Sequence, residues 1–132
     1  MQPVKGVIQN RARAKQLRDF SGLRFGNITP TDIDGLIEYH EKGYIILELK
    51  LRDAVLSDGQ RLALERLTDD LSRAHKPTIC ILANHDTFEP EEDIDAANAL
   101  VTEYRWQRQW QIQKTSYNVR EFIELFLSKI KE

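Results

Sequence analysis

The order of apolar and polar residues predicts a β-hairpin in the first half of the chain. Two β-prone runs, Ile33–His40 and Tyr44–Lys50, flank the short segment Glu41–Gly43, whose last residue is a glycine. Apolar runs of this length around a short loop with glycine are typical of paired antiparallel strands. The second run also carries charged residues, and charges in so apolar a segment need partners.

The register of this hairpin decides which charged groups meet. With Gly43 in the left-handed position of a three-residue loop, Asp34 lies opposite Lys50. Alternate residues of a strand share a face, so Glu48 lies beside Lys50 and diagonally across from Asp34. A two-residue loop would move Asp34 to the other face, but the position of the glycine favours the longer loop. We therefore expect two carboxylates and a lysine on one face.

The remainder of the chain alternates between helix and strand patterns. Ser57 is a good N-cap for a helix that continues to about Ala74, with a buried line through Leu64, Leu67, Leu71 and Ala74. The further expected elements are an N-terminal helix over residues 3–18, a strand over Thr78–Ala83, a hairpin of Ala99–Trp106 and Gln109–Gln113, and a last helix capped by Asn118 and Glu121.

These elements predict an α/β fold, with one domain over residues 1–132. Its centre is a mixed sheet of four or five strands flanked by helices. The helix after Ser57 is long enough for a right-handed crossover between two parallel strands. The continuous apolar run Thr78–Ala83 predicts a central strand that is covered on both faces.

Composition narrows the class of protein. A chain of 132 residues is long enough for one domain with a real core. The single cysteine, Cys80, excludes a disulfide framework and a cysteine-rich zinc site, and its apolar neighbours predict a buried structural thiol. No apolar run approaches membrane-spanning length, and the N-terminus lacks the apolar region of a signal peptide. We expect a cytoplasmic protein without a membrane partner.

The net charge of −2 hides two segments of opposite sign. Residues 1–28 contain six cations and one acid, whereas residues 86–95 contain six acids. Arg11, Lys15 and Arg18 follow helical spacing and form one basic stripe, which either follows nucleic-acid phosphates or is a solvated helix face. The acidic run is expected to be a surface loop, poorly placed beside DNA unless it faces away.

Two further groups each have two interpretations. Asn84-His85-Asp86 follows an expected strand and is either part of a metal site or a polar turn, and the turn is favoured. Tyr104, Trp106 and Trp110 either stack on unpaired bases or pack against the sheet, and packing is favoured.

Two carboxylates and a lysine on one face suit phosphodiester hydrolysis. Mg²⁺ prefers one or two carboxylates together with water and phosphate oxygens. A bound metal lowers the pKa of its water, and a neighbouring lysine orients that water or stabilises the developing charge. The alternative is a buried salt bridge between Lys50 and either Asp34 or Glu48, with no catalysis.

Asp34, a short hairpin and then Glu48-Leu49-Lys50 resemble the D…(D/E)-x-K core of the PD-(D/E)XK nuclease superfamily, which includes restriction endonucleases and Holliday-junction resolvases. The surrounding residues 10–13, 25–35 and 59–67 look like those of small nuclease-like proteins of phages and bacteria. The resemblance implies a restriction-endonuclease-like fold.

It also implies a role for each matching residue. Asp34, Glu48 and the carbonyl of Leu49 would bind Mg²⁺ or Mn²⁺, and Lys50 would serve the attacking water. Gln60, in the first turn of the following helix, lies near the sheet-facing side, where it contacts the active site or a DNA backbone, or only caps the helix.

One departure concerns the first helix. Many members carry a glutamate there as a further ligand, but residues 1–18 contain no acid. Gln9, Asn10 or Gln16 would then be neutral ligands, or the site would hold one metal. The expected function is a metal-dependent DNA endonuclease, with branched or structured DNA among its candidate substrates. The alternative is a catalytically silent domain that binds protein or nucleic acid, such as a phage-encoded modulator of host machinery. Homodimers are common among such folds.

Overall fold

The structure, a computed structural model, describes residues 19–130 of a chain that divides into two units, Met1–Pro30 and Thr31–Glu132. In the first unit, a 3₁₀ turn covers Ser21–Leu23, and Phe25 and Ile28 form a single antiparallel bridge. The helix expected over residues 3–18, with its basic stripe of Arg11, Lys15 and Arg18, lies outside the described residues. That helix and its stripe stay predictions.

The second unit is built on a five-stranded mixed sheet with the order β1-β2-β3-β4-β5. The strands are β1 (Gly35–Tyr39), β2 (Gly43–Leu51), β3 (Thr78–His85), β4 (Leu100–Trp106) and β5 (Gln109–Ile112). Helix α2 (Asp58–Arg73) connects β2 to its parallel neighbour β3, and all other strand pairs are antiparallel. Helix α3 (Val119–Ile130) follows β5. The prediction of an α/β fold with a mixed sheet is confirmed.

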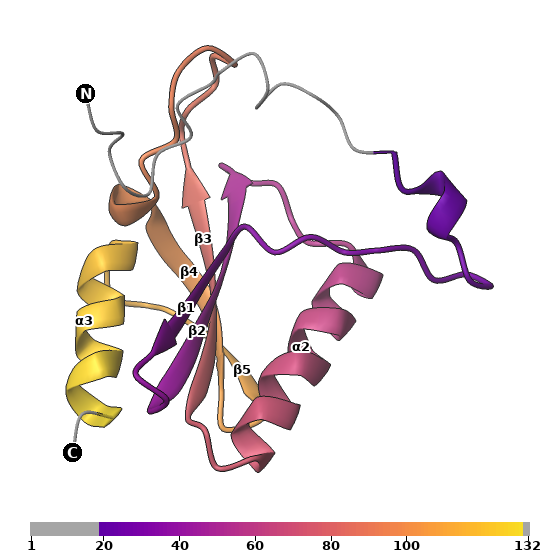
Figure 1. Cartoon of the computed structure of the whole chain (residues 1–132). Helices are drawn as coiled ribbons and strands as arrows, with labels where there is room; N and C mark the ends of the chain where they lie inside the picture. The colour runs from indigo at the N-terminus through magenta and orange to yellow at the C-terminus, as the bar shows by residue number, and fades with distance from the viewer. Residues whose placement is uncertain (1–18, 131–132) are drawn as a thin grey trace, which may run out of the picture. The chain divides into compact units, whose positions relative to one another are not determined.

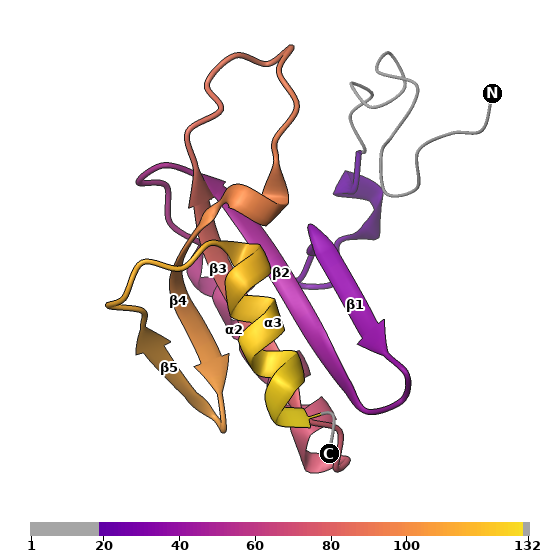
Figure 2. The same ribbon diagram turned by 90° about the vertical axis from the view of Figure 1, so that its left-hand side faces the viewer.

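The two helices lie on opposite faces of the sheet (Figure 1). Figure 2 shows α3 in front of the sheet, running roughly along the direction of β2, with β1 at one edge of the sheet and β5 at the other. The core therefore has two halves. One lies between the sheet and α3 and contains Ile45, Ile81 and Phe126, whereas the other lies towards α2 and contains Ile46 and Leu64. Strand β3 is central and buried on both faces along Thr78–Ala83, as predicted.

Helix α2 begins as the sequence predicts, but its buried face is different. The Ser57 hydroxyl accepts a hydrogen bond from the backbone N–H of Gln60 and caps the helix. Leu64 is buried, but Leu67 is 38% exposed, and Thr68 is buried in its place. Thr68 fits there because its hydroxyl donates to the carbonyl of Leu64, which satisfies the polar group locally.

The β1–β2 hairpin differs from the predicted register by two residues. Tyr39 pairs with Gly43, so the loop contains residues 40–42. Extending this register by one residue puts Asp34 level with Glu48, whereas the prediction put it opposite Lys50. A shift of two residues leaves every side chain on its predicted face, because side chains alternate with a period of two.

The reason for the shift is the backbone of the turn. His40 and Glu41 adopt the left-handed conformation, with φ of 50° and 63°, whereas Gly43 belongs to β2. Gly43 is needed for a close approach instead. A Cβ atom there would lie 2.6 Å from the carbonyl oxygen of Pro77. The prediction of a left-handed Gly43 was therefore wrong.

The last two predicted elements are confirmed. Gln107 and Arg108 form the turn between β4 and β5, both with positive φ. Asn118 and Glu121 exchange hydrogen bonds between side chain and backbone N–H, at 2.8 and 2.9 Å, which is a capping box for α3. Neither helix described here has the length and apolar character to cross a membrane.

Candidate active site

The central group of the candidate site is the buried carboxylate of Glu48. This residue lies in β2 on the face towards α2 and is 2% exposed. Its Oε1 accepts a hydrogen bond of 2.9 Å from the side-chain amide of Gln60. Its Oε2 is buried and has no hydrogen-bond partner among the described residues. A buried oxygen without a partner is unusual and marks a place where a ligand would be stabilised.

Gln60 links this carboxylate to Lys50. The ammonium of Lys50 donates to Oε1 of Gln60 at 3.3 Å, and it lies 3.9 Å from Oε1 of Glu48. The Lys50 side chain is 28% exposed, so it reaches from the buried carboxylate towards solvent. Gln60 is positioned by the cap at Ser57, which fixes the first turn of α2. The sequence-based interpretation that Gln60 faces the site agrees with these contacts.

Asp34 lies at the entrance to β1, on an exposed part of the chain. Its Oδ2 accepts a hydrogen bond of 2.7 Å from the backbone N–H of Leu49. Leu49 is the residue between Glu48 and Lys50, so this hydrogen bond ties Asp34 to the same segment of β2. The structure thus brings Asp34, Glu48, Lys50 and Gln60 together.

Burial and charge act strongly on Glu48. The pKa of Glu48 is raised to about 7, mainly by burial and then by the negative charge of Asp34, while the positive charge of Lys50 opposes both effects. A carboxyl group with this pKa is partly protonated at neutral pH. A bound cation would favour its charged form, so the group is poised for a positive ligand.

A ladder of charged pairs continues from Gln60 across the same face of the sheet. Arg61 makes a bidentate pair with Glu103 of β4, at 2.9 and 3.1 Å. About two turns further along α2, Asp69 makes a bidentate pair with Arg105, at 2.8 and 3.1 Å. These pairs fix α2 against β4 with two forked contacts. We name Arg61–Glu103 and Asp69–Arg105 the ionic ladder.

Sequence reasoning missed the ionic ladder, although it left a signal. Arg61, Glu65 and Asp69 follow each other at four-residue spacing along α2, and Glu103 and Arg105 alternate on β4. The first set faces the sheet and the second faces the helix. Trp110 of β5 completes the contact, because its indole N–H donates to Glu65 at 2.9 Å. The guanidinium of Arg61 lies 4.7 Å from the Trp110 ring centroid.

A cleft of about 270 Å³, with both polar and apolar walls, adjoins Lys50. Asn84 and Thr102 line it from β3 and β4, and Arg61 lines it from α2. It lies where the parallel strands β2 and β3 end, since Lys50 pairs with Asn84 there. The carboxyl ends of parallel strands are the usual location of ligand sites in α/β sheets.

The remaining candidates have structural roles. Cys80 is fully buried and burial raises its thiol pKa to about 12, so it is an inert core residue, as predicted. Tyr104 and Trp106 pack against α3, as favoured. Asp86 pairs with Arg52, and within residues 19–130 no group of three or more His, Cys, Asp or Glu side chains is arranged to hold a metal ion.

The fold and the site define an α/β protein with one mixed sheet and an acid–amide–lysine cluster on the face covered by α2. No protein-family model, curated protein or solved structure matches the chain.

Proposed function

We propose that this protein is a metal-dependent endonuclease of the PD-(D/E)XK type, which hydrolyses phosphodiester bonds in DNA, with branched or structured DNA among its candidate substrates. One observation carries the proposal. Glu48 and Lys50, two residues apart on β2, share the amide of Gln60, and Asp34 is tied to the backbone between them. The hairpin β1–β2 followed by the crossover helix α2 supports a restriction-endonuclease-like fold.

The residues present fit a divalent cation. Oε2 of Glu48 is a hard oxygen without a hydrogen-bond partner in residues 19–130, and Asp34 supplies a second carboxylate. Asp34, Glu48 and the Leu49 carbonyl would hold Mg²⁺ or Mn²⁺. When bound, the cation would lower the pKa of a coordinated water and offset charge on the phosphate.

The protein's own side chains have distinct tasks in this proposal. Lys50 is partly exposed and lines the cleft, where its ammonium would stabilise charge on a phosphate oxygen and orient the attacking water. Gln60 holds one oxygen of Glu48, so that the other oxygen keeps a fixed direction.

The test is a cleavage assay on supercoiled, linear, single-stranded and four-way-junction DNA, with Mg²⁺, with Mn²⁺ and with a chelator. We expect metal-dependent cleavage by the wild type, and a loss of at least about a hundredfold in Asp34→Asn and Glu48→Gln. Absence of cleavage of every DNA form by the wild type would overturn the proposal, and so would equal cleavage by wild type and both variants.

Calorimetry with Mn²⁺ tests the metal site separately. Two carboxylates and a carbonyl should bind the ion weakly, and either substitution should abolish the binding heat. Equal binding in wild type and both variants would remove these residues from the metal site.

A second candidate is a catalytically silent nuclease-like domain that binds protein or nucleic acid. It is favoured by six acids in residues 86–95, which follow β3 at the same end of the sheet as Lys50. Their charge repels a DNA backbone. The cleavage assay above distinguishes the two candidates, and DNA-binding measurements at several salt concentrations test whether the basic stripe of Arg11, Lys15 and Arg18 contacts phosphates. If Arg11, Lys15 and Arg18 contact phosphates, replacing all three by Gln lowers the salt slope by roughly two to three units. An unchanged salt slope would indicate that these three side chains contact no phosphates and form a solvated surface.

A further inference from the structure

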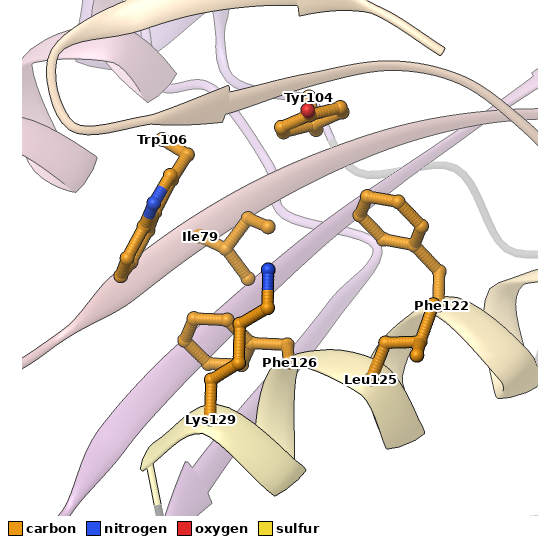
Figure 3. Close-up of a pocket in the computed structure, with 7 residues that line it drawn as sticks. All are labelled: Ile79, Tyr104, Trp106, Phe122, Leu125, Phe126 and Lys129. Atoms are coloured by element: carbon orange, nitrogen blue, oxygen red, sulfur yellow. The ribbon is translucent and has the colours of Figure 1, made fainter. Parts of the chain in front are cut away.

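An aromatic pocket lies on the face of the sheet opposite Glu48, between α3 and the strands (Figure 3). It has a volume of about 130 Å³. Its walls are Ile79 of β3, Tyr104 and Trp106 of β4, and Phe122, Leu125, Phe126 and Lys129 of α3. The candidate active site contributes none of these residues, so the pocket is a separate feature of the molecule.

Two pairs of aromatic rings form the sides of this pocket. Tyr104 and Phe122 have ring centroids 5.0 Å apart, and Trp106 and Phe126 have centroids 5.4 Å apart with nearly perpendicular planes. Each pair joins β4 to α3, and Ile79 of β3 lies in the middle of the group, between Trp106 and Phe122 in Figure 3. Rings that present both faces and edges favour another aromatic ring between them.

The volume of the pocket limits the size of its ligand. Apolar cavities of about 150 Å³ hold one benzene ring. A pocket of about 130 Å³ that is open on one side accommodates one six-membered ring, with a substituent directed outward. A fused ring system or a long lipid chain would not fit.

Lys129 adds a charge to this apolar site. Its side chain extends from α3 towards the space between Trp106 and Phe122 (Figure 3). In residues 19–130 its ammonium has no ion pair. A cation beside an apolar pocket favours a ligand with a negative group next to its ring. The chain's own residues 1–18 carry five cations and no acid, so their charge opposes binding here.

We infer that the pocket binds a small aromatic carboxylate. The ring lies between the two aromatic pairs, and the carboxylate lies at the opening, where Lys129 pairs with it. This inference is independent of the nuclease proposal, because the pocket and the candidate active site lie on opposite faces of the sheet.

The two tryptophans make the test selective. Trp106 lines the pocket, whereas Trp110 packs on the other face of the sheet and donates its indole N–H to Glu65. In ¹⁵N-correlated NMR spectra of the full chain, titration with benzoate should shift the indole N–H signal of Trp106 and leave that of Trp110 in place. A dissociation constant in the millimolar range is expected for a ligand of about nine non-hydrogen atoms.

Charge is tested with ligands and variants. Benzamide, a neutral relative of benzoate, should bind more weakly than benzoate, and the cationic benzylamine should bind more weakly still. Lys129→Gln should weaken benzoate binding about threefold to fivefold, the scale of one partly exposed ion pair, and leave benzamide binding unchanged. Lys114→Gln removes the same charge from outside the pocket and should change neither.

Three results would overturn the inference. The first is no shift of the Trp106 signal with any of the three ligands, which would mean that the pocket is closed or filled by the chain itself. The second is benzylamine binding as well as benzoate. The third is an equal loss of benzoate affinity in Lys129→Gln and Lys114→Gln, which would reduce the effect of Lys129 to overall charge.

Discussion

The side-chain amide of Gln60 donates a 2.9 Å hydrogen bond to Oε1 of Glu48, from the first turn of a helix to a buried position in a strand. The other end of the same amide accepts a hydrogen bond from Lys50. The neutral side chain of Gln60 thus bridges the carboxylate of Glu48 and the ammonium of Lys50 and fixes the direction of both.

Replacing Gln60 by Ala should destabilise the protein. The substitution leaves a second buried oxygen of Glu48 without a donor, which costs about 1–3 kcal/mol in the free energy of unfolding. Urea denaturation measures this change. Arg66→Ala shortens a side chain on the exposed face of the same helix and should stay within about 0.5 kcal/mol of the wild type. Equal effects of the two substitutions would contradict the positioning role of Gln60.

Replacing Lys50 by Ala should separate catalysis from stability. The side chain is 28% exposed and 3.9 Å from Glu48, so its loss should lower the free energy of unfolding by only about 1 kcal/mol. In an endonuclease the same change should reduce turnover by about a hundredfold or more, with little effect on DNA affinity. Cleavage rates, DNA binding and thermal melting of both proteins provide the comparison. A large loss of melting temperature, with no cleavage by the wild type, would support the silent domain.

The stability of the protein should depend on pH through Glu48. The folded-state pKa of about 7 lies above the ordinary value of 4.5, so the folded state binds the proton more tightly than the unfolded state does. Stability is therefore lost as the pH rises from about 4.5 to 7, by up to about 3 kcal/mol. Glu48→Gln should remove this loss and flatten the curve.

Denaturation of wild type and Glu48→Gln at several pH values from 4.5 to 8 tests this dependence. Glu124→Gln is the matched control, because Glu124 is an exposed acid paired with Arg120 on α3 and should leave the pH profile unchanged. A profile of Glu48→Gln parallel to that of the wild type would show that another group causes the dependence.

Two glycines should respond in opposite directions to alanine. At Gly43 a Cβ atom would lie 2.6 Å from the Pro77 carbonyl oxygen and 2.8 Å from Cδ1 of Ile130, so Gly43→Ala should destabilise the protein by about 1–3 kcal/mol. At Gly59, in the first turn of α2, a Cβ would meet no atom within 4 Å, and Gly59→Ala should stabilise by about 0.5–1 kcal/mol. Thermal melting of both variants measures the pair. Destabilisation by Gly59→Ala would show that this position needs its glycine.

Residues better suited to the turn between β4 and β5 should raise the stability of the protein. Gln107 and Arg108 have φ of 52° and 67°, which non-glycine side chains disfavour. Replacing them with Asn-Gly, the preferred pair for such a turn, should stabilise the protein by about 1 kcal/mol. Chemical denaturation checks the sign. A loss of stability would imply that the native side chains make contacts that outweigh the backbone strain.

Much of the fold was predictable because local signals agreed with the tertiary structure. Ser57 and the pair Asn118–Glu121 marked the starts of both helices, and the apolar run Thr78–Ala83 marked the central strand. These features depend on neighbours within a few residues, so the sequence alone contains the deciding information.

The features that were not predictable depend on distant parts of the chain. The hairpin register was misassigned because Gly43 serves a close contact with Pro77, which no local pattern reveals. Thr68 was overlooked as a core residue because its hydroxyl is satisfied within the helix. The grouping of Asp34, Glu48 and Lys50 was still predicted, because a shift of two residues keeps each on the same face.

The site residues Asp34, Glu48, Lys50 and Gln60 all come from one short stretch of the chain, so closing the loops that bring them together costs little entropy. The burial of Glu48 has another origin, since its neighbour across the sheet is Leu82 of β3. During synthesis the hairpin therefore emerges from the ribosome before the strand that covers it. The geometry of the site is available to the nascent chain early, but the raised pKa of Glu48 is acquired only when the second half of the sheet buries it.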